Sequence, residues 1–309
     1  MIDQNILEAV GHTPLVQLNH MTAPEDARIL VKVEALGVGG SIKTRTALKM
    51  IEAAEERGDL KPGSVIVEPT SGNQGIGLAL VGAVKGYEVV IIMPDSVSEE
   101  RRKLITQYGA KLILDHDDGD IGACIDRCIQ KAKAMTAEDP RCYMPNQFAN
   151  TDNRRAHYEG TGREIVEQAD VPIDAFCSGF GTGGTISGIG RALREAYPDV
   201  HICAAEPEHA ALLSGGEIGS HLQMGIGDGV MPPILDKDLI DEIEIVTDEQ
   251  AIETARELAQ KEGLLCGISS GTNVFVAKKL ARRLGRGKTV VTVLPDTGER
   301  YFSTPLFED

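Results

Sequence analysis

The chain has 309 residues, 42% of them apolar, and a formal net charge of −16 at pH 7. This length allows a large core and indicates two domains or one large domain. The charge argues against a nucleic-acid-binding protein, because no basic surplus is available to neutralise phosphates. The net negative charge is still compatible with a locally positive pocket for a small anion.

The amino-terminal segment and the cysteines indicate a protein of the cytoplasm. The start MIDQNILEAVGHTP lacks basic residues and a long apolar run, so no export signal is predicted. No stretch of about 18 apolar residues is present for a membrane span. None of the six cysteines forms the CxxC pairs of a zinc site. We therefore expect reduced thiols and no bound metal.

Short β-branched runs alternate along the chain with longer segments of helical period. This alternation predicts βαβ units and mostly parallel sheet covered on both faces by helices. The expected strands are 28–33, 64–67, 87–93, 111–114, 174–178, 200–205 and 288–294. The expected helices lie near 42–57, 73–85, 98–108, 118–135, 183–196, 247–262 and 270–283.

Two breaks in this pattern indicate how the chain is organised. Residues from about 46 to 148 hold four regular strand-helix alternations, which are typical of a compact module. Segment 207–235 is long, rich in glycine and histidine, and weakly periodic. Long irregular loops inside compact α/β proteins are uncommon and often functional. We expect this segment to shape a substrate pocket.

The first polar motif is GGSIKTR, in which Lys43 follows a Gly-Gly-Ser turn at the start of a predicted helix. A primary amine held there can form a Schiff base with an aldehyde cofactor. The second motif is the loop Thr70-Ser71-Gly72-Asn73, whose amides at another helix start offer an anion site. Taken singly, an exposed helix lysine and an ordinary N-cap explain them equally well.

A glycine cluster follows the predicted strand 174–178, in the sequence DAFCSGFGTGGTISGIG. Free amides at the following helix start would suit a phosphate monoester. However, Gly179, Gly181 and Gly184 also match the dinucleotide pattern GxGxxG, and Glu206 stands where a ribose-binding acid would be expected. A tight structural turn is the third interpretation, and this cluster alone does not separate the three.

The three motifs together favour pyridoxal phosphate. A dinucleotide enzyme has no use for GGSIKTR or for EPTSGNQG. A pyridoxal-phosphate enzyme needs a lysine amine, a phosphate cup, a hydrogen-bond donor beside the phenolic oxygen and a cradle for the amino-acid carboxylate. The amide of Asn73 can supply that donor.

Over nearly its whole length the chain resembles the cysteine synthase/cystathionine β-synthase family of fold type II pyridoxal-phosphate enzymes. The motifs that carry this resemblance are VGHTPLVQLN, GGSIKTRTALKMIEAAEERGDLKPG, IVEPTSGNQGIGLALVGAVKGYEVVIIMP, SEERRKLITQYGAKLIL, GTGGTISG, GISSGTN and PDTGERYFSTPLF. It implies a tryptophan synthase β-like fold with two open, twisted, mostly parallel sheets flanked by helices. It also implies a larger cofactor domain (1–45 plus 149–309), a smaller mobile domain (46–148) and a homodimer.

The resemblance also assigns roles to individual residues. Lys43 would carry the cofactor, Asn73 would bind its ring oxygen, and Ser269 would face the pyridine nitrogen. The phosphate would lie on Gly181, Thr182, Gly183, Gly184 and Thr185. The substrate carboxylate would be held by Thr70, Ser71, Gly72, Asn73, Gln74 and Gln147.

A serine opposite the ring nitrogen influences the expected reaction. A neutral hydroxyl does not hold the ring as a firm pyridinium, so a long-lived carbanion is less stabilised and prompt loss of a β-substituent is favoured. We expect elimination to an aminoacrylate, followed by addition of a nucleophile. Lys43, once released from the cofactor, would act as base and acid for the α-proton.

The chain departs from the family pattern at three points. KTR replaces the usual Lys-Asp-Arg, SGNQG replaces SGNTG, and Asp228 stands in GIGDG where cysteine synthases have a small residue. Gln74 thus changes the expected carboxylate site. Asp228 is either a turn carboxylate, since Asp-Gly is a common turn, or a group that faces the β-carbon. In the second case it would orient water there as a base or repel an anionic thiol nucleophile.

The leading hypothesis is therefore a β-replacement enzyme that makes cysteine and acetate from O-acetylserine and sulfide. The second is release of sulfide from cysteine, with water or a thiol as nucleophile and Asp228 as the base. Serine or threonine dehydration, a dinucleotide-dependent oxidoreductase and a non-enzymatic binding module are weaker alternatives. Docking of a serine acetyltransferase is compatible with the resemblance but is not indicated by the residues.

Overall fold

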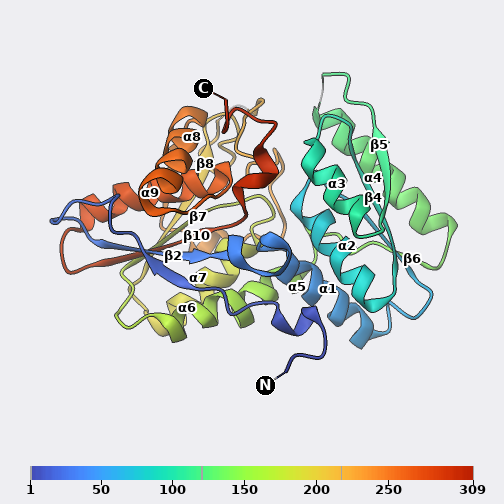
Figure 1. Cartoon of the computed structure of the whole chain (residues 1–309), viewed down its shortest axis with the longest axis horizontal. Helices are drawn as coiled ribbons and strands as arrows, with labels where there is room; N and C mark the ends of the chain where they lie inside the picture. Colours follow the sequence, from blue (N-terminus) through green and yellow to red (C-terminus); the bar gives the residue numbers. More distant parts are fainter. Residues whose placement is uncertain (1, 120, 217, 309) are drawn as a thin grey trace.

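The computed structural model describes residues 2–119, 121–216 and 218–308. Two open sheets organise the chain, and helices lie against both faces of each (Figure 1). The larger sheet has the strand order β1-β2-β10-β7-β8-β9, and the smaller one has the order β5-β4-β3-β6. Every neighbouring pair is parallel except β1 with β2. The expected α/β class with two mostly parallel sheets is confirmed.

The strands of the larger sheet are β1 (Leu15–Gln17), β2 (Arg28–Val33), β7 (Ala175–Gly179), β8 (His201–Pro207), β9 (Glu242–Val246) and β10 (Thr289–Leu294). Those of the smaller sheet are β3 (Val65–Pro69), β4 (Glu88–Pro94), β5 (Lys111–Asp115) and β6 (Cys142–Tyr143). The α-helices are α1 (Lys43–Arg57), α2 (Asn73–Lys85), α3 (Glu99–Gln107), α4 (Ile121–Glu138), α5 (Thr151–Ala156), α6 (Arg163–Gln168), α7 (Gly184–Ala196), α8 (Asp248–Glu257) and α9 (Ile268–Leu284).

All the predicted strands are present, and so are the predicted helices, with ends displaced by a few residues. The prediction missed β1, β6 and β9, together with the helical stretch from α5 to α6. Strands β1 and β6 are only three and two residues long. Strand β9 lies at the sheet edge with the sequence EIEIV, whose glutamates weaken the apolar signal. In the missed helical stretch, a π-helical segment (His157–Gly162) separates α5 from α6.

The apolar runs are continuous because both faces of each sheet are buried. In β2, Ile29 and Val31 pack toward α8 and α9, whereas Leu30 packs on the other face with residues of α6 and α7. The smaller sheet is covered by α1, α2 and α3 on one face and by α4 on the other (Figure 1). Burial on both faces explains why these strands show no alternation of polar and apolar residues.

Three of the predicted motifs directly follow the carboxyl ends of strands. The loop 70–72 follows β3, the glycine cluster follows β7, and segment 295–297 follows β10. Segment 207–235 begins at the last residue of β8, and its described residues after Pro207 contain no helix or named strand. Such an edge is where open α/β sheets bind ligands. None of the described helices is long and apolar enough to cross a membrane.

Candidate functional site

Lys43 is the first residue of α1, and the turn before it is fixed by two glycines. Gly39 and Gly40 have φ values of 74° and 66°, in the left-handed region that favours glycine. The turn is joined to the segment after β10, because Ile42 donates its N–H to the Pro295 carbonyl over 2.8 Å. The position of Lys43 thus depends on the exit of β10 as well as on α1.

Lys43 is half-buried, and its amine feels the charge of Asp228. Burial lowers its pKa, and the charge of Asp228 opposes that shift. Conversely, burial raises the pKa of Asp228, while Lys43 and His221 oppose the change. Within the described residues the amine makes no hydrogen bond or ion pair. An amine of lowered pKa without a partner is available for covalent chemistry with an aldehyde.

The glycine cluster forms a narrow cup at the start of α7. Gly183 precedes the helix in a left-handed conformation, with φ of 80°. A Cβ at Gly181 would lie 2.4 Å from Oδ2 of Asp228 and 2.9 Å from the carbonyl oxygen of Gly225. Only glycine therefore fits beneath the loop that carries Asp228, and this contact brings the carboxylate to the cup.

A second layer, which sequence reasoning missed, supports the cup from α5 and from the π-helical segment that follows it. Asn153 donates its Nδ2 to Thr182 Oγ1 over 3.0 Å and to the Gln147 carbonyl over 2.8 Å. His157 Nε2 lies 3.3 Å from Thr185 Oγ1. Burial, followed by the charges of Lys43 and Arg45, lowers the pKa of His157 well below its usual value, so the imidazole is neutral.

The loop 70–73 ends at the start of α2, as predicted. Thr70 Oγ1 accepts the Gly72 N–H over 3.3 Å, which closes the loop on itself. Asn73 Nδ2 donates to Asp296 Oδ2 over 2.6 Å, and Asn73 Oδ1 accepts from Arg300. The loop is therefore connected directly to the segment that also holds the Lys43 turn.

The other predicted site residues differ in how open they are to a ligand. Gln74 is 1% exposed, and its Oε1 accepts from Thr46 on α1 over 2.7 Å, so its oxygen faces α1. Its Nε2 is buried without a partner. Within the described residues, neither the Gln147 side-chain amide nor the buried hydroxyl of Ser269 makes a hydrogen bond. Both groups remain available to a bound molecule.

Glu206 does not occupy a nucleotide site. Its carboxylate accepts hydrogen bonds from the Leu213 and Ser214 backbone N–H groups, over 2.7 and 3.1 Å. The Ser214 hydroxyl donates to it over 2.8 Å. All these contacts lie in the segment that follows β8. Glu206 thus secures the start of the pocket loop, which accounts for a buried acid at the end of this strand without a ribose.

Comparison with known proteins identifies the family of the chain. Residues 6–296 match the family model described as pyridoxal-phosphate dependent enzyme. The chain belongs to that family. It is 47% identical over 304 residues to a cysteine synthase of Staphylococcus aureus, covering 98% of this chain and 96% of the relative.

Solved structures of the same family share the fold over nearly the whole chain. A cysteine synthase from Entamoeba histolytica matches with a TM-score of 0.94 and 38% identity, covering 100% of this chain and 92% of that one. A hydrogen sulfide-producing enzyme from Fusobacterium nucleatum matches with a TM-score of 0.91 and 38% identity, covering 97% and 100%. The chain is therefore a pyridoxal-phosphate-dependent enzyme of the cysteine synthase family. The interpretation of the glycine cluster as a dinucleotide site is abandoned.

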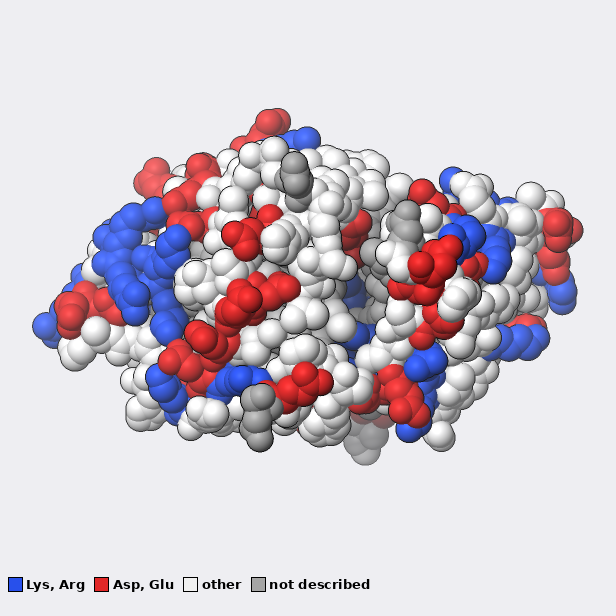
Figure 2. All heavy atoms as spheres, turned by 90° about the horizontal axis from the view of Figure 1, so that it is seen from above, with Lys and Arg blue, Asp and Glu red and all other residues white. Residues whose placement is uncertain are grey.

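The residues of this site fit pyridoxal phosphate. The half-buried Lys43 amine suits its aldehyde, and the Ser269 hydroxyl, which has no hydrogen-bond partner among the described residues, suits its ring nitrogen. Asn153 packs closely against the cup because residue 184 is a glycine, since a Cβ there would come within 2.2 Å of Asn153 Oδ1. That oxygen is itself buried without a partner. Figure 2 shows a recess between the two parts of the molecule with Lys or Arg atoms inside it, as a pocket for an anion requires.

Replacing Gly181 by alanine tests the cup. Because the new methyl group would overlap Asp228 and Gly225, we expect a loss of about 1–3 kcal/mol in unfolding free energy and weaker cofactor binding. Urea unfolding and cofactor titration of the cofactor-free protein measure the two effects. Gly219→Ala is the control, in the segment that carries Asp228, where the nearest atom is 3.7 Å from the new Cβ. Equal behaviour of the two variants would contradict a tight cup.

Glu68 is a buried acid of the site that the sequence did not reveal. It accepts the backbone N–H groups of Asn146 and Gln147, over 2.8 and 2.9 Å. Burial raises the pKa of Glu68 to about 7, and these two hydrogen bonds oppose the shift. Glu68 therefore links the end of β3 to the backbone that carries Gln147.

This raised pKa predicts a pH dependence of stability. The folded protein binds the Glu68 proton more tightly than the unfolded chain, whose carboxyl titrates near 4.5. The stabilisation is complete below that value and is lost as the pH rises through about 7. We expect the unfolding free energy to fall by at most about 1.4 kcal/mol per pH unit in this window. Urea unfolding from pH 5 to 8 should show a smaller fall for Glu68→Gln; equal slopes would contradict the assignment.

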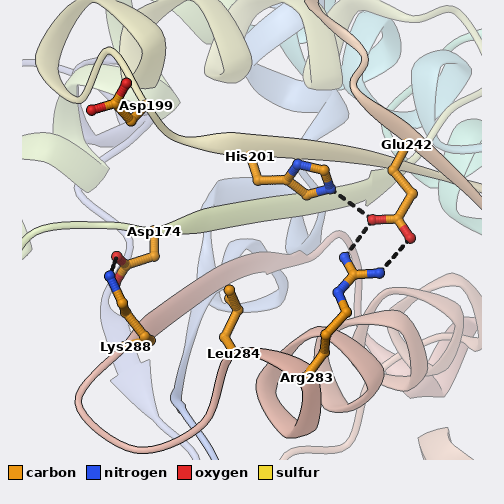
Figure 3. Close-up of a pocket in the computed structure, with 7 residues that line it drawn as sticks. All are labelled: Asp174, Asp199, His201, Glu242, Arg283, Leu284 and Lys288. Atoms are coloured by element: carbon orange, nitrogen blue, oxygen red, sulfur yellow. Dashed lines mark hydrogen bonds and ion pairs between the residues drawn. The ribbon is translucent and has the colours of Figure 1, made fainter.

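A separate hollow of about 500 Å³ lies at the opposite, amino-terminal ends of the strands (Figure 3). Its charged side chains largely pair with one another. Arg283 and His201 both contact Glu242, and Lys288 contacts Asp174 over 2.8 Å. The hollow therefore has no part in the site at the carboxyl ends.

Proposed function

We propose that this enzyme makes cysteine and acetate from O-acetylserine and sulfide, with pyridoxal phosphate held on Lys43. The observation that carries the proposal is the half-buried Lys43 amine, of lowered pKa and without a partner among the described residues, in a chain that has a glycine cup and is so similar to a cysteine synthase. Bound pyridoxal phosphate supplies an electron sink that stabilises charge at the substrate α-carbon.

The surrounding residues position the substrate and move its α-proton. The loop from Thr70 to Asn73 would hold the substrate carboxylate on its amides and hydroxyls, with help from the free Gln147 amide. Lys43, once exchanged for the substrate amine, would remove and return the α-proton. Thr182 and Thr185, oriented by Asn153 and His157, would hold the phosphate.

The proposal is tested by product analysis of the purified enzyme loaded with pyridoxal phosphate. The protein is incubated with O-acetylserine and sulfide, with serine and sulfide, and with cysteine alone, and amino acids and sulfide are quantified. We expect cysteine to form fastest from O-acetylserine. Cysteine consumption as the dominant reaction would favour the second candidate, and no turnover in any mixture would contradict both.

The second candidate is release of sulfide from cysteine, and Asp228 is the observation that favours it. Its carboxylate lies over Gly181 and faces Lys43, where the β-carbon of a bound amino acid would be expected. The raised pKa of Asp228 suits a group that accepts and returns a proton. A water molecule activated there would give serine, and a thiol would give a thioether.

We further propose a cytoplasmic homodimer in which residues 46–148 move as a unit relative to 1–45 and 149–309. Family resemblance supports the dimer and the mobile unit, and the position of the smaller sheet, between Val65 and Tyr143, agrees with those bounds. Docking of a serine acetyltransferase at the site belongs to the same proposal. Light scattering of the purified enzyme, alone and mixed with such a partner, measures both assemblies.

A further inference from the structure

The Asn73 side-chain amide lies between two groups of opposite hydrogen-bonding character. Its Nδ2 donates to the Asp296 carboxylate over 2.6 Å, and its Oδ1 accepts from the Arg300 guanidinium. Asp296 is 1% exposed and Arg300 is 5% exposed, so water does not substitute for either partner. They lie more than 220 residues from Asn73 in the sequence and follow β10 of the other sheet.

These two partners decide which way the amide points. A carboxylate only accepts hydrogen bonds, and a guanidinium only donates them. A rotation of 180° about the last side-chain bond would set the amide oxygen against Asp296 and the amide N–H groups against Arg300. Both contacts would then be repulsive and two charge-assisted hydrogen bonds would be lost. The observed orientation leaves one N–H of Asn73 free of both partners.

Asp296 and Arg300 are themselves held in place. The Tyr301 hydroxyl donates to Asp296 Oδ2 over 2.8 Å, and a Cβ at Gly267 would come within 2.3 Å of Asp296 Oδ1. Arg300 also donates to the carbonyl of Gly39, in the turn before Lys43. The orientation of the Asn73 amide is thus tied to the backbone that places the Lys43 amine.

We propose that Asp296 and Arg300 are positioning residues that keep an N–H of Asn73 directed at the phenolic oxygen of bound pyridoxal phosphate. This inference rests on the proposed placement of the cofactor on Lys43 and Asn73, and not on the identity of the amino-acid substrate. Asn73 begins α2, which covers the smaller sheet, whereas Asp296 and Arg300 follow β10 of the larger sheet. The donor is therefore oriented only while the two sheets are held together.

The test is the visible absorption spectrum of the loaded enzyme, which reports the ionisation of the phenolic oxygen, together with cofactor affinity. Asn73→Ala removes the donor, and its changes in spectrum and in cofactor affinity are the reference with which the other variants are compared. We expect Asp296→Ala to change the spectrum in the same direction and to weaken cofactor affinity roughly tenfold, as for the loss of a hydrogen bond to a charged group. Asp296→Asn, which keeps an accepting oxygen, should recover most of the change.

The double variant separates positioning from general damage. If Asp296 acts through Asn73, adding Asp296→Ala to Asn73→Ala changes neither spectrum nor affinity further. Tyr301→Phe removes the other hydrogen bond to the same oxygen, and we expect a clearly smaller spectral change. Additive effects in the double variant, or an unchanged spectrum in Asp296→Ala, would overturn the inference.

The outcome is independent of which reaction the enzyme performs. Failure of the wild-type enzyme to make cysteine, with these spectral effects intact, would refute the proposed substrate and leave the inference standing. Cysteine formation by the wild-type enzyme without the spectral effects would support the proposed substrate and refute the inference about Asp296 and Arg300. Urea unfolding of each cofactor-free variant checks that the variant is folded before its spectrum is interpreted.

Discussion

Lys43→Ala is expected to lose at least about 10²–10⁴-fold in turnover, the range typical of a removed acid-base group. The loss has two causes, because the same amine would hold the cofactor covalently and later move the α-proton. Rates are measured with O-acetylserine and sulfide at saturating pyridoxal phosphate. Borohydride reduction followed by peptide mass spectrometry shows where the cofactor is attached.

Lys49→Ala is the matched control on the same helix. Lys49 forms an ion pair with Glu159 over 2.7 Å at the surface, so its loss should have little effect on stability or rate. The reduced cofactor should appear on Lys43 in the wild type and in the control. Turnover of Lys43→Ala within tenfold of the wild type, or labelling at another lysine, would contradict the assignment.

Asp228→Asn is expected to separate the two candidate reactions. If Asp228 activates water, serine and sulfide formation from cysteine falls by about 10²–10⁴-fold. Cysteine formation from O-acetylserine needs no activated water and should be retained or increased. The measured quantity is the ratio of the two rates, which cancels differences in the amount of loaded enzyme.

The same substitution should also move the pH dependence of cofactor uptake. The Asp228 charge raises the pKa of the Lys43 amine, so its removal lowers that pKa further. More neutral amine is then present at low pH, and uptake by the cofactor-free protein extends to lower pH. Asp238→Asn, at an exposed position of the same connection, is the control. An unchanged rate ratio would make Asp228 a simple turn carboxylate.

The fold could be predicted because its strands and helices are specified by patterns of neighbouring residues in the sequence. Strands such as β4 and β10 are short β-branched runs buried on both faces, and the helices between them show a regular apolar period. Lys43, the loop to Asn73 and the glycine cluster could be found for a similar reason. Each lies next to a strand or a helix start, where the backbone already limits what the residue can do.

The supporting layer of the site could not be predicted, because its contacts connect distant segments. The Asn153 amide reaches the hydroxyl of Thr182, and the backbone N–H of Gln147 reaches Glu68, 79 residues earlier. A buried polar residue must find a partner, but the sequence does not say which one. Gln74 illustrates the point, since its oxygen is used by Thr46 rather than turned to the loop.

The carboxylate of Glu206 has a practical consequence for changing the enzyme by design. It accepts hydrogen bonds from the backbone of residues 213 and 214. The first part of segment 207–235 is therefore held in place and forms the base of the segment. The stretch beyond that base carries Asp228, and its described residues contribute no strand to either sheet. Exchanging this stretch between relatives, with Glu206, Ser214 and the buried Gln223 left untouched, would transfer a new pocket wall while keeping the Gln223 hydrogen bond to the Val246 carbonyl of β9. Glu206 thus marks the position after which the pocket segment would be replaced to alter the substrate range.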